Sequence, residues 1–310
     1  MTTKPRSQKA KKSKPSSGST KKSTKRAAAQ TQRAKPQAQA QAPALPQPPK
    51  DGFKDIGLLS FGEKAIRKRS QKAPGAAGFA LAGSTGDRKR VVDTRQVPFR
   101  KICDLVITAA DSTLHSGTAF FISPRTLVTS GHCLFVSDSG TAAHGMVRKV
   151  LVMPARNGET DASQSFVGWV EVGQESLRVH DRWMSDGDLD FDYGVIILPP
   201  DQALGAQVGV FDVNPFSDQQ LQGARPTLAG YPDNVPDGTQ WHETNPIKQV
   251  EPAHLMYDIF TFGGQSGSPV FFVNGNKQTA CAIHNFGNIP FNRGVRITPA
   301  VKAQLNAWKV

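Results

Sequence analysis

From about Val97 onwards the chain is a succession of short strand-like runs, and this texture limits the fold more than any other feature of the sequence. The runs are rich in Val, Ile, Phe and Thr, and Asn, Asp, Gly and Pro separate them, as in β-proteins with tight turns. Asn274-Gly275-Asn276 between two of them is typical of a hairpin. So many short strands over residues 97–310 predict an all-β fold, in the form of a barrel or a pair of barrels. The runs are ICDLVIT, GTAFFIS, TLVTS, VRKVLVM, FVGWVEV, YGVIILP, QVGVFDV, PTLAGY, SPVFFV and TACAIH.

Only the end of the chain has a helical pattern. Val301, Leu305 and Trp308 are spaced so that they lie on one face of a helix. Thr298 can cap that helix, and Pro299 suits its first turn, where the missing N–H of proline is not needed. We therefore expect the β-rich body to close with one C-terminal α-helix.

The formal net charge of +13 belongs to the first part of the chain rather than to this body. Residues 1–50 contain thirteen Lys or Arg and no Asp or Glu, so the remainder is balanced. They also lack aromatic side chains and cannot bury enough surface to offset the entropy of ordering. We expect a disordered arm over 1–50, a linker or pro-segment over 51–90 and a folded domain over 91–310. The arm is either a solubilising spacer or a weak contact for polyanions.

Signals for export, membrane insertion and disulfide bonding are weak. No apolar segment follows the basic start of the chain, as a secretory signal peptide requires. No run approaches the ~18–20 apolar residues of a membrane span. Cys103, Cys133 and Cys281 are an odd number and give no disulfide framework, so we expect them to be small buried side chains. The compartment stays open on these features.

One glycine- and serine-rich segment interrupts the strand pattern. IFTFGGQSGSPVFF, at residues 259–272, places Gly and Pro where a strand interior would favour Val, Ile or Thr. A serine becomes a nucleophile only when a base removes its proton and a third group orients that base. The segment therefore raises the question of whether a suitable His and Asp occur elsewhere.

A histidine and an aspartate each stand at the end of a strand-like run. His132 follows an apolar run in TLVTSGHC, where a tight turn can direct the imidazole into a cleft. Asp192 directly precedes YGVIIL, so a sheet would fix its position. The nearby Asp186, Asp188 and Asp190 are interpreted as solvated loop charge, because no Glu follows at the offset that a calcium loop needs. Five other histidines lie in polar, loop-like surroundings and are expected at the surface, namely His115, His144, His180, His242 and His254.

The segments TSGHC, DYGVIIL and GGQSGSPVF, in this order, resemble the His, Asp and Ser segments of the chymotrypsin-like serine proteases. They are most similar to the bacterial glutamyl endopeptidases, in which the serine motif reads Ser-Gly-Ser-Pro-Val. The resemblance extends from about Arg88 to the C-terminus. It implies two antiparallel six-stranded β-barrels with the active site in the crevice between them, and a serine endopeptidase acting on peptides or proteins.

The resemblance also assigns roles within the three segments. Ser266 is the implied nucleophile, His132 its base and Asp192 the group that orients the base, whereas Ser268 is structural. A binding protein that keeps this fold without catalysis is the competing hypothesis, with the basic arm docking nucleic acid or membrane. Such proteins usually lack a member of the triad, and this sequence has a candidate for each.

The oxyanion site implied by the resemblance lies in the same glycine-rich segment. The backbone N–H groups of Gly264 and Ser266 would bind the developing oxyanion. Gly263 and Gly267 would permit the tight backbone path without Cβ clashes. For this loop taken alone, a glycine-rich bulge in a barrel is the structural alternative.

The specificity pocket is also read from the resemblance. A hydroxyl residue five positions before the serine and a histidine on a later strand bind the substrate carboxylate in glutamyl endopeptidases, and here these are Thr261 and His284. Phe286 and Gly287 would flank the bound peptide. This predicts cleavage after Glu, or less readily Asp. The alternatives are a core role for His284 and a protease of the same fold with small or aromatic preference. No metal or organic cofactor is indicated.

Two departures from the family pattern stand out. The usual disulfide partner of Cys133 is replaced by Gly117, which favours a reducing compartment although the family resemblance favours secretion. Some eighty residues precede the point at which mature relatives begin. We hypothesise that residues 1 to about 85 are a pro-segment or regulatory arm that is removed on activation.

Overall fold

The computed structural model describes residues 87–158, 166–287 and 291–310. The described residues all belong to one compact unit that spans Leu45–Val310. The predicted arm over 1–50, and all but the last few residues of the predicted linker over 51–90, lie outside the described residues.

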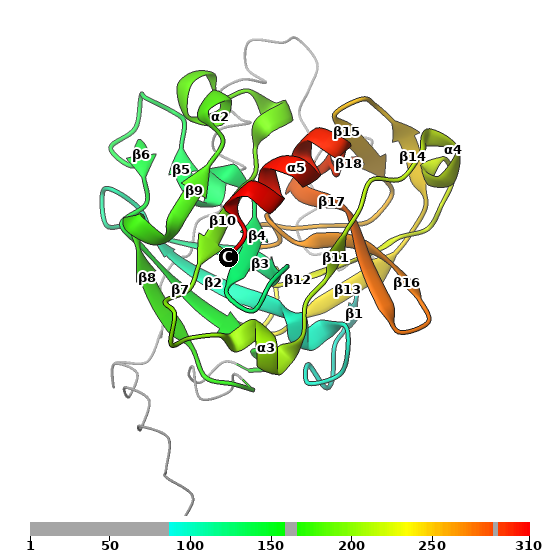
Figure 1. Cartoon of the computed structure of the whole chain (residues 1–310), viewed down its shortest axis with the longest axis horizontal. Helices are drawn as coiled ribbons and strands as arrows, with labels where there is room; N and C mark the ends of the chain where they lie inside the picture. Colours follow the sequence, from blue (N-terminus) through cyan, green and yellow to red (C-terminus); the bar gives the residue numbers. More distant parts are fainter. Residues whose placement is uncertain (1–86, 159–165, 288–290) are drawn as a thin grey trace, which may run out of the picture. The chain divides into compact units, whose positions relative to one another are not determined.

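The first barrel is drawn in cyan and green on the left of Figure 1. Among the described residues its sheet has seven strands in the order β8-β7-β2-β3-β4-β10-β9, all paired antiparallel. The two end strands follow each other in the chain and are separated only by the 3₁₀ turn η4 (Gln174–Ser176). They are halves of one bent strand, so the sheet closes into a six-stranded barrel. The strands are β2 (Ile102–Thr108), β3 (Leu114–Phe121), β4 (Thr126–Thr129), β7 (Lys149–Pro154), β8 (Val170–Gly173), β9 (Leu177–Val179) and β10 (Gly194–Ile197).

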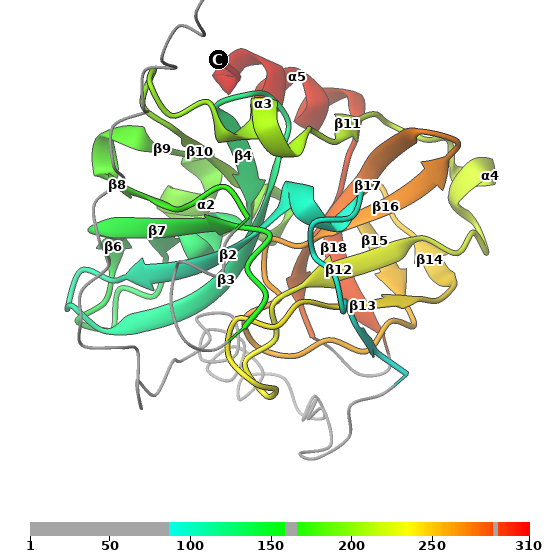
Figure 2. The same cartoon turned by 90° about the horizontal axis from the view of Figure 1, so that it is seen from below.

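The second barrel, in yellow and orange, closes in the same way (Figure 2). Its sheet runs β13-β12-β16-β17-β18-β15-β14, and the two end strands are joined by Asn245 and Pro246. Two short strands are added: β1 extends the sheet beyond β13, and β11 pairs parallel to β17. The prediction of two six-stranded barrels is confirmed. The strands are β1 (Lys89–Arg90), β11 (Asp212–Val213), β12 (Thr227–Gly230), β13 (Trp241–Thr244), β14 (Ile247–Val250), β15 (His254–Tyr257), β16 (Pro269–Asn274), β17 (Lys277–Phe286) and β18 (Asn292–Arg296).

The predicted hairpin at Asn274-Gly275-Asn276 is also confirmed. β16 ends at Asn274 and β17 begins at Lys277, and Gly275 in the turn has a φ of 56°. That left-handed backbone is the reason for a glycine at the turn. The remaining elements are short apart from α5. They are η1 (Phe99–Lys101), η2 (Gly131–Cys133), η5 (Leu189–Phe191), the ribbon of β5 (Phe135–Val136) and β6 (Gly145–Met146), and the helices α2 (Asp181–Asp186), α3 (Leu204–Val208), α4 (Asp218–Leu221) and α5 (Pro299–Trp308).

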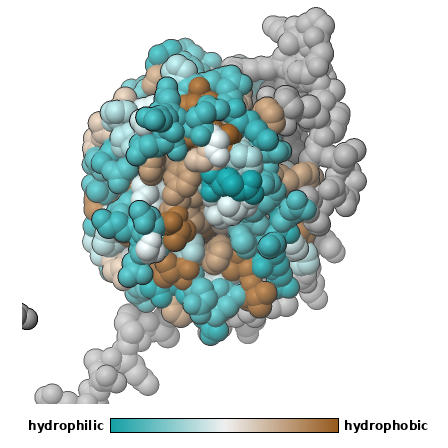
Figure 3. Space-filling model, turned by 90° about the vertical axis from the view of Figure 1, so that its right-hand side faces the viewer, coloured by the Kyte–Doolittle hydropathy of each residue, from teal (hydrophilic) through white to brown (hydrophobic). Residues whose placement is uncertain are grey.

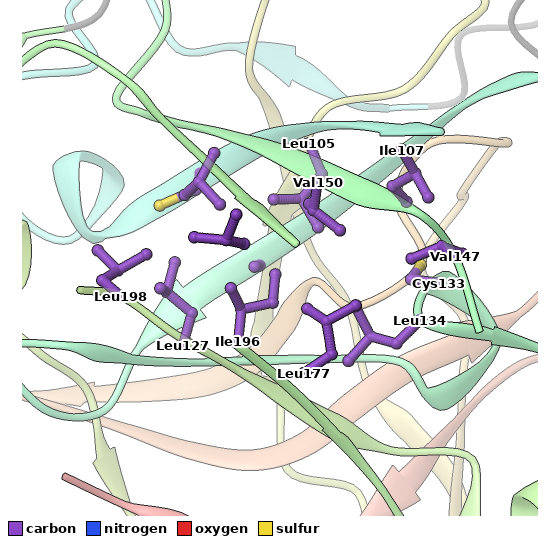
Figure 4. Packing of buried hydrophobic residues seen from close by; sticks show 14 of the residues in the cluster. Leu105, Ile107, Leu127, Cys133, Leu134, Val147, Val150, Leu177, Ile196 and Leu198 are labelled. Atoms are coloured by element: carbon purple, nitrogen blue, oxygen red, sulfur yellow. The ribbon is translucent and has the colours of Figure 1, made fainter. Parts of the chain in front are cut away.

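The interior of the first barrel is filled by aliphatic side chains from its strands (Figure 4). Leu105 and Ile107 of β2, Val150 of β7, Leu177 of β9 and Ile196 of β10 all belong to this cluster. Alternate residues of a strand face the same side of a sheet, which explains why β2 contributes every second residue. The packing fixes the strand ends, where the candidate catalytic residues lie.

A second cluster joins the two barrels. It combines Phe120 and Val195 of the first barrel with Phe271 and Ile283 of the second. Residues on the buried face of α5 pack into the same cluster, and Figures 1 and 2 both show this red helix lying over the junction. Burying a side chain of this size contributes about 1.5–3 kcal/mol, so the cluster holds the barrels in a fixed relation.

The C-terminal helix forms as predicted. Thr298 Oγ1 accepts a hydrogen bond from Val301 N at 3.2 Å, and Pro299 occupies the first turn. Val301 and Leu305 are buried, while Trp308 packs at the edge against Tyr193, with ring centroids 5.9 Å apart. The helix therefore locks onto the first barrel beside the strand that follows Asp192.

Figure 3 shows the side of the molecule formed by the second barrel. Hydrophilic side chains cover most of the described surface there, and apolar ones occur in patches between them. No helix in the described residues is long and apolar enough to cross a membrane.

Candidate active site

His132 and Asp192 meet because the strands next to them are paired. His132 lies in η2 just after β4, and Asp192 lies between η5 and β10. β4 and β10 are antiparallel, with Thr129 opposite Gly194, so the end of one strand adjoins the start of the other. The Nδ1 and Oδ2 atoms of the pair are 2.7 Å apart, and His132 N donates to Asp192 Oδ1, also at 2.7 Å. An ionised carboxylate only accepts, so Nδ1 carries the proton.

Burial makes this pair electrostatically strong. Asp192 has no exposed surface and His132 is 3% exposed. Burial by itself lowers the pKa of His132, but the Asp192 carboxylate outweighs it and raises that pKa above the ordinary value. The pair is thus arranged to stabilise an imidazolium, and His132 Nε2 has no hydrogen-bond partner among the described residues.

Ser266 lies against the same pair from the other barrel. Its carbonyl accepts a hydrogen bond from Thr118 N at 2.8 Å, and Cys133, next to His132, places its thiol 3.8 Å from that carbonyl oxygen. Its hydroxyl points to the Asn285 carbonyl at 3.5 Å. The structure therefore brings the three predicted segments together, with the Ser266 hydroxyl turned towards β17 rather than bonded to His132.

A buried polar network that the sequence did not reveal connects these segments. The Asn285 amide donates to Asp192 O and to Ser130 Oγ, and its oxygen accepts from Val295 N. Ser130 Oγ in turn donates to His284 O at 2.9 Å. Ser130 lies within the segment TSGHC and Asn285 directly follows His284, and these places in the chain are the only signals that could have singled them out.

The candidate oxyanion loop depends on two glycines. Gly264 and Gly267 have φ values of 85° and 88°, in the left-handed region. A Cβ on Gly264 would lie 2.4 Å from Tyr231 O, and one on Gly267 would lie 2.1 Å from Thr118 O. Positive φ in this loop occurs at Gly264 and Gly267 and not at Gly263, so Gly264 joins Gly267 as a position that needs glycine.

Some backbone N–H groups of this loop have hydrogen-bond acceptors among the described residues, and two do not. Gln265 N, Gly267 N and Ser268 N all bond to backbone carbonyls. Within the described part of the chain, no acceptor is paired with the N–H of Gly264 or of Ser266. Two unpaired donors on one tight turn form the kind of site that binds a developing negative charge.

The candidate specificity residues lie together beside this loop. Thr261 is 4% exposed, and its hydroxyl has no partner among the described residues. An ideal Cβ on Gly287 would lie 3.9 Å from that hydroxyl. Phe286, the last residue of β17, stacks on the His132 ring with the centroids 5.5 Å apart. β17 therefore connects the candidate specificity pocket with His132.

His284 is held by a residue that sequence reasoning missed. Its Nδ1 atom is 2.7 Å from the hydroxyl of Tyr257, which lies in β15. Burial, and then the nearby His132, lower the pKa of His284 to about 3, so it is neutral in the free protein. Burial also raises the pKa of Tyr257, which keeps its proton. Tyr257 had no signal in the sequence because its role depends on the pairing of β15 and β18.

The Arg88 side chain contacts the candidate oxyanion loop through Gln265. Its guanidinium donates to Gln265 Oε1 at 3.3 Å and to Asn234 Oδ1 at 3.1 Å, and lies 4.8 Å from the Phe260 ring centroid. Gln265 Oε1 also accepts from Phe262 N. The segment that leads into β1 therefore contributes to the backbone that carries Thr261 and Ser266.

The three cysteines are free and buried, as expected. The space beside Gly117, where the disulfide partner of Cys133 would lie in the family, is taken up by the Cys133 thiol and the Ile107 side chain. An ideal Cβ on Gly117 would lie 3.1 Å from Cys133 Sγ and 2.9 Å from Ile107 Cδ1. Neither Cys103 nor Cys281 replaces the missing partner. No group of three or more metal-binding side chains occurs in residues 87–158, 166–287 and 291–310.

Two of the five histidines expected at the surface are buried. His115 is 3% exposed and His254 is 5% exposed, because both lie in strands, β3 and β15. His115 bonds to Thr113 Oγ1 at 2.8 Å, and His254 Nδ1 is 3.4 Å from Asp190 Oδ1. The expectation failed for these two because polar neighbours along the chain do not exclude a strand, in which one face is buried while the other is exposed.

Comparisons with known proteins agree with this geometry. The model of the trypsin-like peptidase domain matches residues 117–277. Glutamyl endopeptidase of Bacillus licheniformis is 34% identical over 256 residues, which cover 80% of this chain and 74% of the relative. A Bacillus subtilis protein named extracellular metalloprotease is 30% identical over 226 residues, with coverages of 72% and 68%. A solved Glu endopeptidase structure aligns with a TM-score of 0.61 and 24% identity over 73% of this chain and 98% of its own.

Proposed function

Because the chain belongs to the trypsin-like peptidase family and is a serine endopeptidase, we propose that His132, Asp192 and Ser266 form its catalytic triad and that it cleaves after Glu. Asp before the scissile bond would be accepted less readily. The observation that carries the triad is the buried pair of His132 and Asp192, which the Asn285 amide holds beside the Ser266 hydroxyl, 3.5 Å from the Asn285 carbonyl.

In the first half of the proposed reaction, the Ser266 hydroxyl turns from the Asn285 carbonyl to His132 Nε2, which takes its proton. The oxygen attacks the substrate carbonyl carbon, and the carbonyl electrons move onto the oxygen that the Gly264 and Ser266 N–H groups face. The tetrahedral intermediate then expels the amine, which receives the proton from His132. An ester between Ser266 and the acyl part of the substrate remains.

The second half repeats these steps with water. His132 takes a proton from the water, whose oxygen attacks the ester carbonyl, and the proton returns to Ser266 Oγ as the acid leaves. Throughout both halves, the Asp192 carboxylate accepts a hydrogen bond from Nδ1–H of His132. It keeps Nε2 free as the base and stabilises the imidazolium that forms in each half.

The proposed preference for Glu rests on two donors. The Thr261 hydroxyl is buried without a partner among the described residues, which suits a ligand that accepts hydrogen bonds. With the Tyr257 hydroxyl donating to His284 Nδ1, the remaining proton of the neutral ring sits on Nε2 as a second donor. A carboxylate would satisfy both groups, and its charge would raise the pKa of His284.

Replacing Thr261 with Val should lower kcat/KM for Glu substrates by about 10–100-fold, because a hydrogen bond to a charged group is worth about 1.5–3 kcal/mol. Valine keeps the shape of threonine and removes the hydroxyl. The measurement is hydrolysis of peptides that differ only at the residue before the scissile bond, with Glu, Asp, Gln, Ala, Phe or Lys there. A matching Gln substrate should change by much less. Equal losses on all peptides, or a wild-type preference for Ala or Phe, would contradict the assignment.

The rate should rise with pH as His132 loses its proton. The Asp192 charge raises the pKa of His132, so the midpoint of kcat/KM against pH should lie above the ordinary imidazole value of about 6.5. The measurement is initial rate on a peptide whose other groups do not titrate between pH 5 and 9. A midpoint well below 6 would argue against a base paired with a carboxylate.

The decisive experiment for the triad is labelling with a serine-directed fluorophosphonate. Wild-type protein should lose activity as one label attaches to the peptide that contains Ser266. The Ser266→Ala variant should take up no label. Attachment at another serine would refute the assignment.

A further inference from the structure

Among the residues that the structure describes, the most deeply buried charged group outside the catalytic centre is the guanidinium of Arg156, a residue that follows β7. Its side chain is 1% exposed and lies between two carboxylates. It donates to Asp104 Oδ2 of β2 at 2.6 Å and to Asp237 Oδ2 at 2.6 Å, with a further contact to Asp237 Oδ1 at 3.3 Å. Asp104 belongs to the first barrel and Asp237 to the second, so one cation connects them.

Asp237 lies in the segment 231–240, which packs on Arg156 at several points. The Tyr231 hydroxyl donates to Arg156 O at 3.1 Å, and Gly158 N donates to Gly238 O at 3.1 Å. Gly238 has a φ of 67°, and a Cβ there would lie 2.4 Å from Arg156 Nε. The segment is therefore held tightly against the first barrel near Gly238, and the side chain of Tyr231, from the start of the segment, reaches the same place.

The other end of the same segment holds the candidate oxyanion loop. Asp233 N donates to Gly263 O at 2.8 Å, and the Tyr231 carbonyl presses against Gly264. The C=O of Gly263 and the N–H of Gly264 belong to one planar trans peptide, in which they point in opposite directions. A hydrogen bond that holds the oxygen on one side keeps the N–H on the other.

We propose that Arg156 is a positioning residue for catalysis. Through Asp237 it anchors the segment 231–240, so that Asp233 N keeps the peptide between Gly263 and Gly264 from turning over. Without the anchor, that peptide can rotate and withdraw one of the two oxyanion donors. The inference rests on the proposed oxyanion role of Gly264.

The chemistry of Arg156 fits this role. Its planar guanidinium binds two carboxylates at fixed angles, which a lysine ammonium cannot do. Removing Arg156 would leave Asp104 buried and unpaired, which would destabilise the fold as a whole. Asp237 is the better site for a test, because its side chain is 42% exposed and the pair between Arg156 and Asp104 survives its replacement.

The test is Asp237→Asn, with kcat expressed per active site titrated by a slow-turnover ester. Losing a whole oxyanion donor costs about 100–1,000-fold in kcat. Asp237→Asn loosens the donor without removing it, so we expect kcat to fall by less, about tenfold, while KM stays within twofold. Arg156→Lys should give a similar or larger loss. Glu171→Gln is the matched control, because it removes the exposed partner of Lys149 in the first barrel and should change nothing.

A lower melting temperature with unchanged kcat per titrated site would overturn the proposal, because it would show that the contact only stabilises the fold. A parallel Ser266→Ala measurement separates this from failure of the function itself. If Ser266→Ala is inactive and Asp237→Asn is fully active, the positioning role alone is wrong. If Ser266→Ala remains active, both are wrong.

Discussion

Replacing Ser266 with Ala is expected to lower kcat by about a million-fold, the usual result of removing the nucleophile of a serine protease. The oxygen that forms the acyl bond is lost, while the two N–H donors of the loop remain. Those donors and substrate binding should leave a residual rate above that of water, and KM should change little. The measurement is turnover of a Glu-containing peptide at high enzyme concentration.

The matched control for this variant lies two residues away. Ser268 is fully buried, and its hydroxyl has no hydrogen-bond partner among the described residues. Ser268→Ala should therefore retain most of the activity and all of the fluorophosphonate labelling. An inactive Ser268→Ala together with an active Ser266→Ala would reverse the roles that we propose for the two serines. Circular dichroism and the melting temperature show whether each variant is folded.

The barrels could be predicted from the sequence because strand texture is local. Most runs of β-branched and aromatic residues between turn residues became strands, and the helix that starts at Pro299 followed from its cap and spacing. The run QVGVFDV is the exception, because it starts in α3 and only Asp212 and Val213 at its end form a strand, β11. The points at which each barrel closes could not be predicted. They depend on the bends at Gln174–Ser176 and at Asn245 and Pro246, where one strand leaves one edge of the sheet and continues on the other.

Some residues of the candidate site could also be predicted from the sequence, and others could not. His132 and Asp192 stand at strand ends and could be chosen from their neighbours along the chain. Tyr257 and Arg156 could not, because what they contact is far away in sequence: His284 for the first, Asp104 and Asp237 for the second. The sequence thus reveals the groups proposed to react, and the structure adds those that orient them.

Asp192→Asn is expected to lower kcat by about ten-thousand-fold at neutral pH, although the side chain keeps its size. The Asp192 carboxylate accepts from both the Nδ1 hydrogen and the backbone N–H of His132. An asparagine can satisfy the backbone N–H with its oxygen only by turning its NH₂ group towards Nδ1. Nδ1 must then be the acceptor, so the ring carries its proton on Nε2 and cannot take one from Ser266.

The control for this variant is Asp190→Asn, which removes an exposed carboxylate two residues earlier, 3.4 Å from His254 Nδ1, and should leave kcat within a fewfold of wild type. Asp192→Asn should also shift the midpoint of the pH profile downwards, because the charge that raises the pKa of His132 is gone while the burial that lowers it remains. A large loss in kcat with an unchanged midpoint would mean that Asp192 supports the fold and does not act on the histidine. The pH profile therefore decides between the two roles, because a purely structural carboxylate would leave the titration of His132 where it was.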